Sequence, residues 1–162
     1  MIYNNNESKK CCYAMRDEIE QIIKDENIDR KYFYEVSKLK YEQIIRKFYF
    51  TFCDYKKYPI IDLSYLWLRF RKELEFSEKI YFYKDFKEFI EKISVLVPDN
   101  DDDRFYYLIL DYGWVYEGKL KEIQNVLYCT SVLLEDFYIV SKKFDWFIGH
   151  SDDGQSLCLV TT

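Results

Sequence analysis

The chain has 162 residues, a hydrophobic fraction of 49% and a net charge of −5. A chain of this length is expected to form one domain that buries roughly 70% of its unfolded surface, and its apolar content argues against intrinsic disorder. The net charge gives no general attraction to phosphate backbones, and lysines are spread among acids, so no nucleic-acid partner is expected. An acidic protein can instead attract a basic protein.

Cysteine and histidine usage argues against metal sites and disulfide frameworks. The cysteines are Cys11, Cys12, Cys53, Cys129 and Cys158. Their number is odd and no C-x-x-C spacing occurs, so neither a disulfide framework nor a zinc site is predicted. The start MIYNNNESKK lacks an apolar run, and no stretch approaches the ~18 apolar residues of a membrane span. We therefore expect a cytoplasmic protein with free thiols and no membrane contact.

The first half of the chain predicts helices. Residues 1–7 read as a frayed tail, and apolar side chains at helical spacing predict helices over 8–25 and 39–52. Residues 31–37 are ambiguous between a short strand and a helix start. Pro59 breaks the chain before a third predicted helix over 62–76.

The middle of the chain predicts one strand and one helix. EKIYFYK (78–84) has the composition of a strand. The helix that follows spans 86–97, with Asp85 as its N-terminal cap and Phe86, Phe89, Ile90 and Ile93 on its apolar face. Pro98 and the acidic run after it end this helix.

The second half is richer in strands. The run RFYYLILDY (104–112) predicts a strand buried on both faces, and a helix is predicted over 117–130. Three more strands are predicted over 135–142, 144–150 and 155–162, with SDDG as the hairpin turn between the last two. The whole pattern predicts a single α+β domain over 1–162, with N-terminal helices packed on a C-terminal antiparallel or mixed sheet.

The acidic loop before the strand at 104–112 is the first candidate binding site. Its acids are Asp99, Asp101, Asp102 and Asp103. The spacing resembles the start of a calcium loop, but Arg104 replaces the required glycine and Leu110 replaces the bidentate glutamate. We therefore interpret it as a solvated loop and as the best electrostatic contact for a basic partner.

The second candidate surrounds the single histidine, in the stretch FDWFIGHSDDG. His150 and Ser151 precede Asp152 and Asp153, but neighbours in a tight turn do not converge as a hydrolytic triad does. A zinc site would need further histidine or cysteine ligands. We predict a structural turn whose acidic tip, Asp152 and Asp153, contacts a partner. No catalytic, cofactor-binding or metal-binding residue is predicted.

The stretch DYGWVYEG (111–118) leaves two alternatives open. It can be a strand-to-helix turn with Trp114 packed in the core, or a cleft lined by Trp114, Tyr116 and His150. Its two glycines do not follow the G-x-G-x-x-G pattern that cradles phosphates.

The second half also resembles a group of small bacterial proteins known only as a domain of unknown function. The shared pattern is Trp-x-Tyr-Glu-Gly, a helix, and then Tyr-Ile-Val-Ser-Lys-Lys-aromatic-x-Trp. The matching residues are Trp114, Tyr116, Glu117 and Gly118, followed by 138–144 and Trp146. The likeness covers residues 80–155. The resembling proteins are in turn loosely similar to SMI1/KNR4-type immunity proteins, although this chain lacks the glycine-rich loop of that superfamily. The resemblance implies neutralisation of a toxin encoded beside it.

Composition and resemblance together predict a non-enzymatic immunity protein without a cofactor. It would bind a cognate toxin domain, expected to be a basic nuclease, and occlude its active site, with Asp99, Asp101, Asp102 and Asp103 pairing with basic side chains. One alternative is a phage-encoded or regulatory inhibitor of another cytoplasmic protein. A second alternative is a small ligand-binding domain or enzyme that uses the 111–118 turn.

Overall fold

The structure is a computed structural model that describes residues 8–64, 66–82, 86–98, 100–111, 113–130, 136–151 and 155–160. The predicted tail at 1–7, the cap Asp85, and the predicted contact residues Asp99, Asp152 and Asp153 lie outside these ranges.

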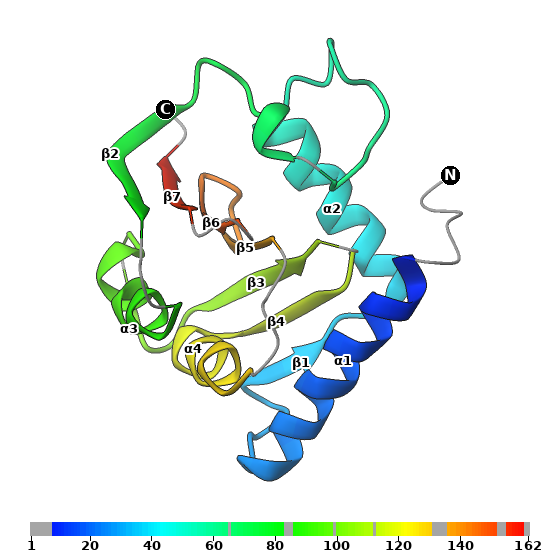
Figure 1. The fold of residues 1–162 in the computed structure, drawn as a ribbon, viewed down its shortest axis with the longest axis vertical. Coiled ribbons are helices and arrows are strands. Elements are labelled where there is room, and N and C mark those ends of the chain that lie inside the picture. The colour runs from blue at the N-terminus through cyan, green and yellow to red at the C-terminus, as the bar shows by residue number, and fades with distance from the viewer. Residues whose placement is uncertain are drawn as a thin grey trace.

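Helices are interspersed among the strands up to α4, and the last three elements are strands (Figure 1). The helices are α1 (Ser8–Asp25), α2 (Lys38–Phe52), α3 (Phe86–Leu96) and α4 (Leu120–Cys129), with the short 3-10 turn η1 (Leu66–Leu68). The strands are β1 (Phe33–Glu35), β2 (Glu75–Phe82), β3 (Phe105–Leu110), β4 (Val115–Lys119), β5 (Phe137–Ser141), β6 (Trp146–His150) and β7 (Gln155–Val160).

The strands form one seven-stranded sheet in the order β1-β4-β3-β5-β6-β7-β2. Every neighbouring pair is antiparallel. The predicted α+β class is confirmed, and of the two predicted sheet types the antiparallel one is found. The sheet is larger than predicted at its edges, because β1 from the N-terminal third occupies one edge and β2 the other.

Helices cover both faces of the sheet, as Figure 1 shows. The core of one face joins apolar residues of α1, α3 and α4 to alternate residues of the strands. The core of the other face joins α2 and the segment 53–74 to the intervening residues. Side chains of β6 alternate between the two cores, since Trp146 and Ile148 belong to the first core and Phe147 to the second. Leu108 and Ile109 are both fully buried, so β3 is covered on both faces as predicted.

The helix predicted over 62–76 was wrong. Leu63, Leu66 and Leu74 are buried, but only Leu66–Leu68 is helical, as a 3-10 turn. The backbone around it bonds to the end of α2 instead. The Asp54 N–H donates to the Arg69 carbonyl at 2.7 Å, the Arg71 N–H donates to the Phe52 carbonyl at 2.9 Å, and Cys53 forms a β-bridge with Phe70. These tertiary hydrogen bonds replace the ladder that a helix would need.

The strand β4 was not predicted, because its last three residues were assigned to the following helix. A tight turn joins it to β3: Gly113 has a φ of +91°, and the Leu110 N–H donates to the Trp114 carbonyl at 2.9 Å. Glycine adopts this conformation without the steric cost of a side chain. The ambiguous stretch 31–37 contains β1, which pairs with β4 through Phe33 and Gly118.

Candidate functional site

The acidic loop is exposed, and two of its described carboxylates are paired with local cations. Asp101 lies 3.7 Å from the Arg104 guanidinium, and Asp103 lies 3.3 Å from the Lys119 ammonium. The Asp101 carboxylate also accepts the Asp103 N–H at 3.0 Å, which fixes the turn. The side chain of Asp103 is 94% exposed, so these pairs are surface pairs that a partner's cations can replace.

The acidic loop and His150 lie at opposite ends of the sheet. The acidic loop leads into the start of β3, where Tyr106 pairs with Ser141 at the end of β5. The other end of β5 begins at Phe137, which pairs with His150 at the end of β6. The predicted contact residues Asp152 and Asp153 themselves lie outside the described residues.

His150 is a buried core residue. Its ring centroid lies 5.1 to 5.2 Å from those of Phe86, Phe89 and Phe137, and it stacks nearly parallel to the last two. This aromatic packing joins α3 to the end of β6. The sequence analysis interpreted the stretch with His150 as a structural turn and not as a catalytic or metal site. The packing of the His150 ring in the core agrees with a structural role.

Trp114, Tyr116 and His150 do not line a common cavity among the described residues. Tyr116 is fully buried under α1, stacks on Phe33 at 5.0 Å and donates a hydrogen bond to Glu20. Trp114 is half-buried and packs against the core of the α1, α3 and α4 face. The cleft alternative for 111–118 therefore lacks the lining that the sequence interpretation required.

Trp114 contributes instead to a polar cavity of about 480 Å³ where α1, β1 and α2 meet. Arg16 stacks on the Trp114 ring at 5.3 Å and binds the Glu35 carboxylate through two nitrogens. Tyr41 donates a second hydrogen bond to Glu35 at 2.8 Å. The pairing with Glu35 raises the pKa of Arg16, and burial followed by the Glu35 hydrogen bond raises the pKa of Tyr41. The carboxylate is thereby saturated by partners within the chain.

The motif shared with the resembling proteins also forms structural contacts. Lys142, from its second half, donates to the carboxylate of Glu117 in its first half. A Cβ on Gly118 would lie 2.6 Å from a ring carbon of Phe33 and 2.8 Å from the Tyr32 carbonyl oxygen. The motif residues thus hold β1, through the close approach at Gly118, and the turn after β5, through Lys142, against β4.

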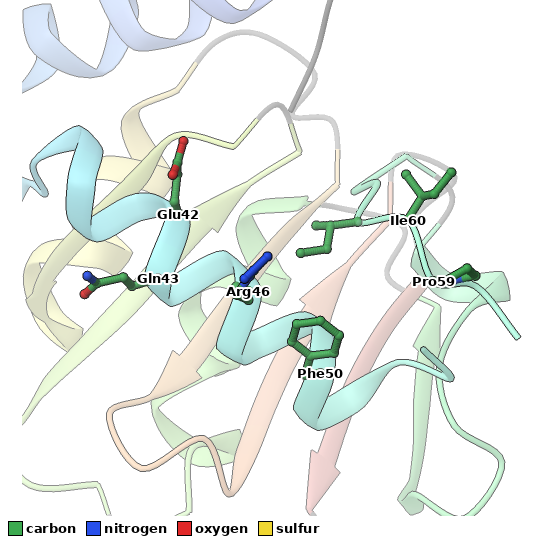
Figure 2. Close-up of a pocket in the computed structure, with 7 residues that line it drawn as sticks. Glu42, Gln43, Arg46, Phe50, Pro59 and Ile60 are labelled. Atoms are coloured by element: carbon green, nitrogen blue, oxygen red, sulfur yellow. The ribbon is translucent and has the colours of Figure 1, made fainter. Parts of the chain in front are cut away.

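A further cavity among the described residues lies on the outer side of α2. It has a volume of about 700 Å³ and is lined by Glu42, Gln43, Arg46 and Phe50 of α2 and by 59–61 of the facing loop. Figure 2 shows Gln43, Arg46 and Phe50 following one another along the helix, with Pro59 and Ile60 on the loop opposite. We call this cavity the α2 groove.

Many of the exposed large apolar side chains come from α2 and the segment that follows it. Among residues whose burial is described, eight large apolar side chains are exposed, and five of them come from α2 or 53–74. They are Leu39, Phe50, Tyr55, Ile60 and Leu68. Of these, Phe50 and Ile60 line the α2 groove, and the ring centroid of Tyr55 lies 5.4 Å from that of Phe50. Ile60 is 74% exposed, although aliphatic residues of this size are normally buried.

The loop wall of the α2 groove is held in place by polar contacts. The Tyr49 hydroxyl donates to the Tyr58 carbonyl at 2.9 Å, which ties the loop to α2. Arg69 donates to the Asp62 carboxylate at 2.9 Å and to the Ile60 carbonyl at 3.5 Å. The groove is therefore preformed, so binding there would cost little ordering of the loop.

The charge of the chain is unevenly divided between the α2 side and the rest. Residues 38–74 contain nine Lys or Arg and four Asp or Glu, which gives +5, so the remainder of the chain carries −10. The sequence interpretation treated the lysines as evenly spread. The excess of basic over acidic residues in 38–74 shows instead that the α2 side of the chain is basic.

The described residues contain neither a candidate metal site nor a membrane-spanning helix. No group of three or more His, Cys, Asp or Glu side chains within them could hold a metal ion. None of the helices in those ranges is long and apolar enough to cross a membrane.

Comparison with protein families matches residues 12–162 to a single family model. The chain belongs to DUF6756, a family of unknown function. The match agrees with the expectation of a domain of unknown function, and it shows no link to SMI1/KNR4 proteins. No curated protein and no solved structure matches the chain.

The α2 groove of this DUF6756 member was missed from the sequence, but two signals point to it. Leu39 and Phe50 are apolar yet lie off the inward stripe of α2, which contains Ile44, Ile45 and Phe48. The second signal is the excess of basic residues over 38–74. Amphipathic periodicity alone does not separate an exposed binding face from ordinary surface.

Proposed function

We propose that this DUF6756 member is a non-enzymatic inhibitor that binds a partner protein, and specifically an immunity protein that neutralises a toxin domain. The observation that carries the proposal is the α2 groove, a preformed cavity lined in part by exposed Phe50 and Ile60. Aromatic residues and arginine predominate among the residues that anchor protein complexes, and Phe50 and Arg46 lie side by side here. The toxin setting comes from the resemblance to immunity-type proteins.

Inhibition would work by occlusion. A side chain of the partner would enter the α2 groove, and the surrounding surface would cover the functional surface of the toxin. The fixed loop wall, held by Tyr49 and Arg69, favours a slow dissociation rate because little conformational entropy is lost on binding.

The acidic loop would steer a basic toxin toward this protein. Asp102 is exposed, and the surface pairs of Asp101 and Asp103 can be exchanged for pairs with the partner's Lys or Arg. Charges at the rim of an interface act mainly on the association rate. Asp99, Asp152 and Asp153 would add to the same long-range attraction.

Co-purification with the product of the neighbouring gene, together with a growth assay on co-expression, tests the proposal. The wild-type chain is expected to form a complex and to restore growth, and Ile60→Ser is expected to weaken binding about tenfold. Val95→Ser is the matched control, because Val95 is equally exposed but lies on α3. No complex at low salt, or equal losses in both variants, would contradict the proposal.

A triple variant isolates the role of the acidic loop. Asp101→Asn, Asp102→Asn and Asp103→Asn together are expected to slow association about tenfold at low salt and to have little effect at high salt. Stopped-flow fluorescence measures the association rate. A neighbouring gene that encodes a non-toxic protein would favour the regulatory-inhibitor alternative over immunity.

A further inference from the structure

Arg69 and Arg71 lie two residues apart but differ in their partners. Arg69 donates to the Asp62 carboxylate at 2.9 Å, and its guanidinium lies 5.6 Å from the ring centroid of Tyr58. The Nε of Arg71 is covered by protein and has no hydrogen-bond acceptor among the described residues. A covered donor without an acceptor destabilises a fold, so a ligand that supplies an acceptor to Arg71 would be bound favourably.

The backbone places Arg71 beside a turn that contains two lysines. The Arg71 N–H donates to the Phe52 carbonyl at 2.9 Å, and Lys56 and Lys57 are exposed on the turn that follows α2. These three cations line one cavity of about 600 Å³, together with Tyr55. We call it the Arg71 cavity. It shares no lining residue with the α2 groove.

Two acids also line the Arg71 cavity, and they limit its positive charge. Three cations against two carboxylates leave +1, from Lys56, Lys57 and Arg71 against Asp54 and Glu73. The Asp54 carboxylate accepts the Lys57 N–H at 3.2 Å, so it caps its own turn. Glu73 is exposed, so water screens its charge. The lining therefore favours an anion over a cation.

The cations and the volume of the cavity indicate the class of ligand. A guanidinium presents its N–H groups in a fixed fork that matches the oxygens of a phosphate or a carboxylate. A phosphate monoester carries a charge of about −1.5 to −2 at pH 7 and three acceptor oxygens, so it gains more from three cations than a single carboxylate does. Cavities of roughly 300–1,000 Å³ hold small molecules. Tyr55 adds an exposed aromatic ring that can contact an organic part.

We propose that the Arg71 cavity binds the phosphate group of a small molecule, with Arg71 donating to the phosphate oxygens while Lys56 and Lys57 compensate the charge. Free phosphate and a small phosphate ester share this chemistry. The site goes beyond the proposed inhibitor function and does not depend on it, because the α2 groove has a different lining.

Titration of the full-length protein with four probes tests this inference. The probes are inorganic phosphate, adenosine monophosphate, adenosine and acetate. NMR follows the Nε–H signals of the arginine side chains, and the signal of Arg71 is identified by its loss in Arg71→Gln. Phosphate is expected to shift the Arg71 signal and to leave that of Arg69 in place. Acetate is expected to bind about tenfold more weakly than phosphate, and adenosine is not expected to bind.

The relative affinities of the two phosphate probes identify the source of the phosphate group. If adenosine monophosphate binds at least about threefold more tightly than inorganic phosphate, the site takes a phosphate ester whose organic part contacts Tyr55. If the two affinities are equal, the site takes free phosphate. Either result supports the inference.

Variants with opposite expected effects test the role of charge. Arg71→Gln is expected to weaken phosphate binding about tenfold, because it removes a charge-assisted hydrogen bond. Glu73→Gln is expected to strengthen it about threefold, because it removes a negative charge from the lining. A purely structural role of Arg71 would not produce this gain. Arg46→Gln, in the α2 groove, is the matched control and is expected to leave binding unchanged.

Three results would overturn the inference. They are no shift of the Arg71 signal up to about 50 mM phosphate, acetate binding as tight as phosphate binding, and equal effects of Arg71→Gln and Arg46→Gln. Circular dichroism confirms that each variant is folded. If Arg71→Gln does not fold, Lys56→Gln on the exposed turn takes its place, with about threefold weaker binding expected and unchanged binding counting against the site.

Discussion

Glu117 is a buried carboxylate on the strand next to the β1 edge of the sheet, and its charge is compensated by one lysine. The residue is only 8% exposed on β4, and Lys142 reaches it from the turn after β5. Lys142 also lies 4.6 Å from the ring centroid of Tyr107. Burial is the largest single influence on the pKa of Lys142 and lowers it, but the hydrogen bond and the charge of Glu117, together with Tyr107, raise this pKa overall. A carboxylate in this position is costly without its partner.

Replacing the lysine should therefore destabilise the fold more than replacing its neighbour does. Lys142→Met keeps the aliphatic stem but leaves Glu117 unpaired, and we expect a loss of about 2 kcal/mol in the free energy of unfolding. Lys143→Met is the matched control at an exposed position and should change it by less than about 0.5 kcal/mol. Urea denaturation measures both values. Equal values would mean that the Glu117–Lys142 pair contributes nothing to stability.

Cys53, at the end of α2, is a buried thiol. Burial raises its pKa to about 12, so the thiol remains protonated at neutral pH. Only the thiolate reacts readily with alkylating agents. We expect iodoacetamide to leave Cys53 unmodified in the native protein and to modify it in guanidinium chloride, as measured by peptide mass spectrometry. Modification of the native protein at the unfolded rate would show that the end of α2 opens freely.

At the level of elements, one carboxylate of α1 is bonded both to the sheet and to the turn that follows the helix. Glu20 of α1 accepts two hydrogen bonds from Arg30 and one from Tyr116 of β4. The hydrogen bonds from Arg30 lower the pKa of Glu20 below its ordinary value of 4.5. The stabilisation is present above this ordinary value and is lost as the pH falls through the lower, folded-state pKa.

The substitution Glu20→Gln should consequently have a pH-dependent effect. At pH 7 we expect it to lower the free energy of unfolding by about 1 kcal/mol, and at pH values below the folded-state pKa the difference from wild type should shrink toward zero. Glu91→Gln on the exposed face of α3 is the control and should show neither effect. Urea denaturation across this pH range measures the difference, and a constant difference would contradict the assignment to ionised Glu20.

Some elements could be predicted from the sequence. In these, the backbone forms the helix or strand hydrogen bonds that the spacing of apolar residues indicates. Helices α1 to α4, strand β3 and the β6–β7 hairpin are of this kind. The segment 62–76 has a helical apolar pattern, but its backbone bonds to Asp54 and Phe52. Strand β4 runs into α4 without a break at Leu120, so its period-two pattern was hidden by the helix pattern that follows.

The candidate site was predicted less well than the fold. Local composition showed the acidic loop, because its aspartates are adjacent in the sequence. The α2 groove depends on the position of 59–61 across from Arg46 and Phe50, which Arg69 and Tyr49 fix through long-range contacts. The residue pattern of a helix carries no information about which loop lies opposite that helix.

For the molecule as a whole, the sheet order predicts how local stability is distributed. Strands β3 and β5 have a hydrogen-bonded neighbour on each side, whereas β1 and β2 are at the edges. We expect the amides of β3 and β5 to exchange with deuterium most slowly, and those of β1 and the outward-facing amides of β2 to exchange fastest. Native-state hydrogen exchange followed by NMR measures this order. Equal protection of β2 and β5 would show that the β2 edge is covered in solution.

The pairing of β2 with β7 has a consequence for the order of events during synthesis. Strand β2 leaves the ribosome early, but its neighbour β7 is the last strand to be made. Nascent β2 must therefore remain without a partner while β3 to β6 emerge and form their own antiparallel pairs. The sheet closes at this edge only once β7 has emerged, so β2 is open to pairing with other chains during that interval.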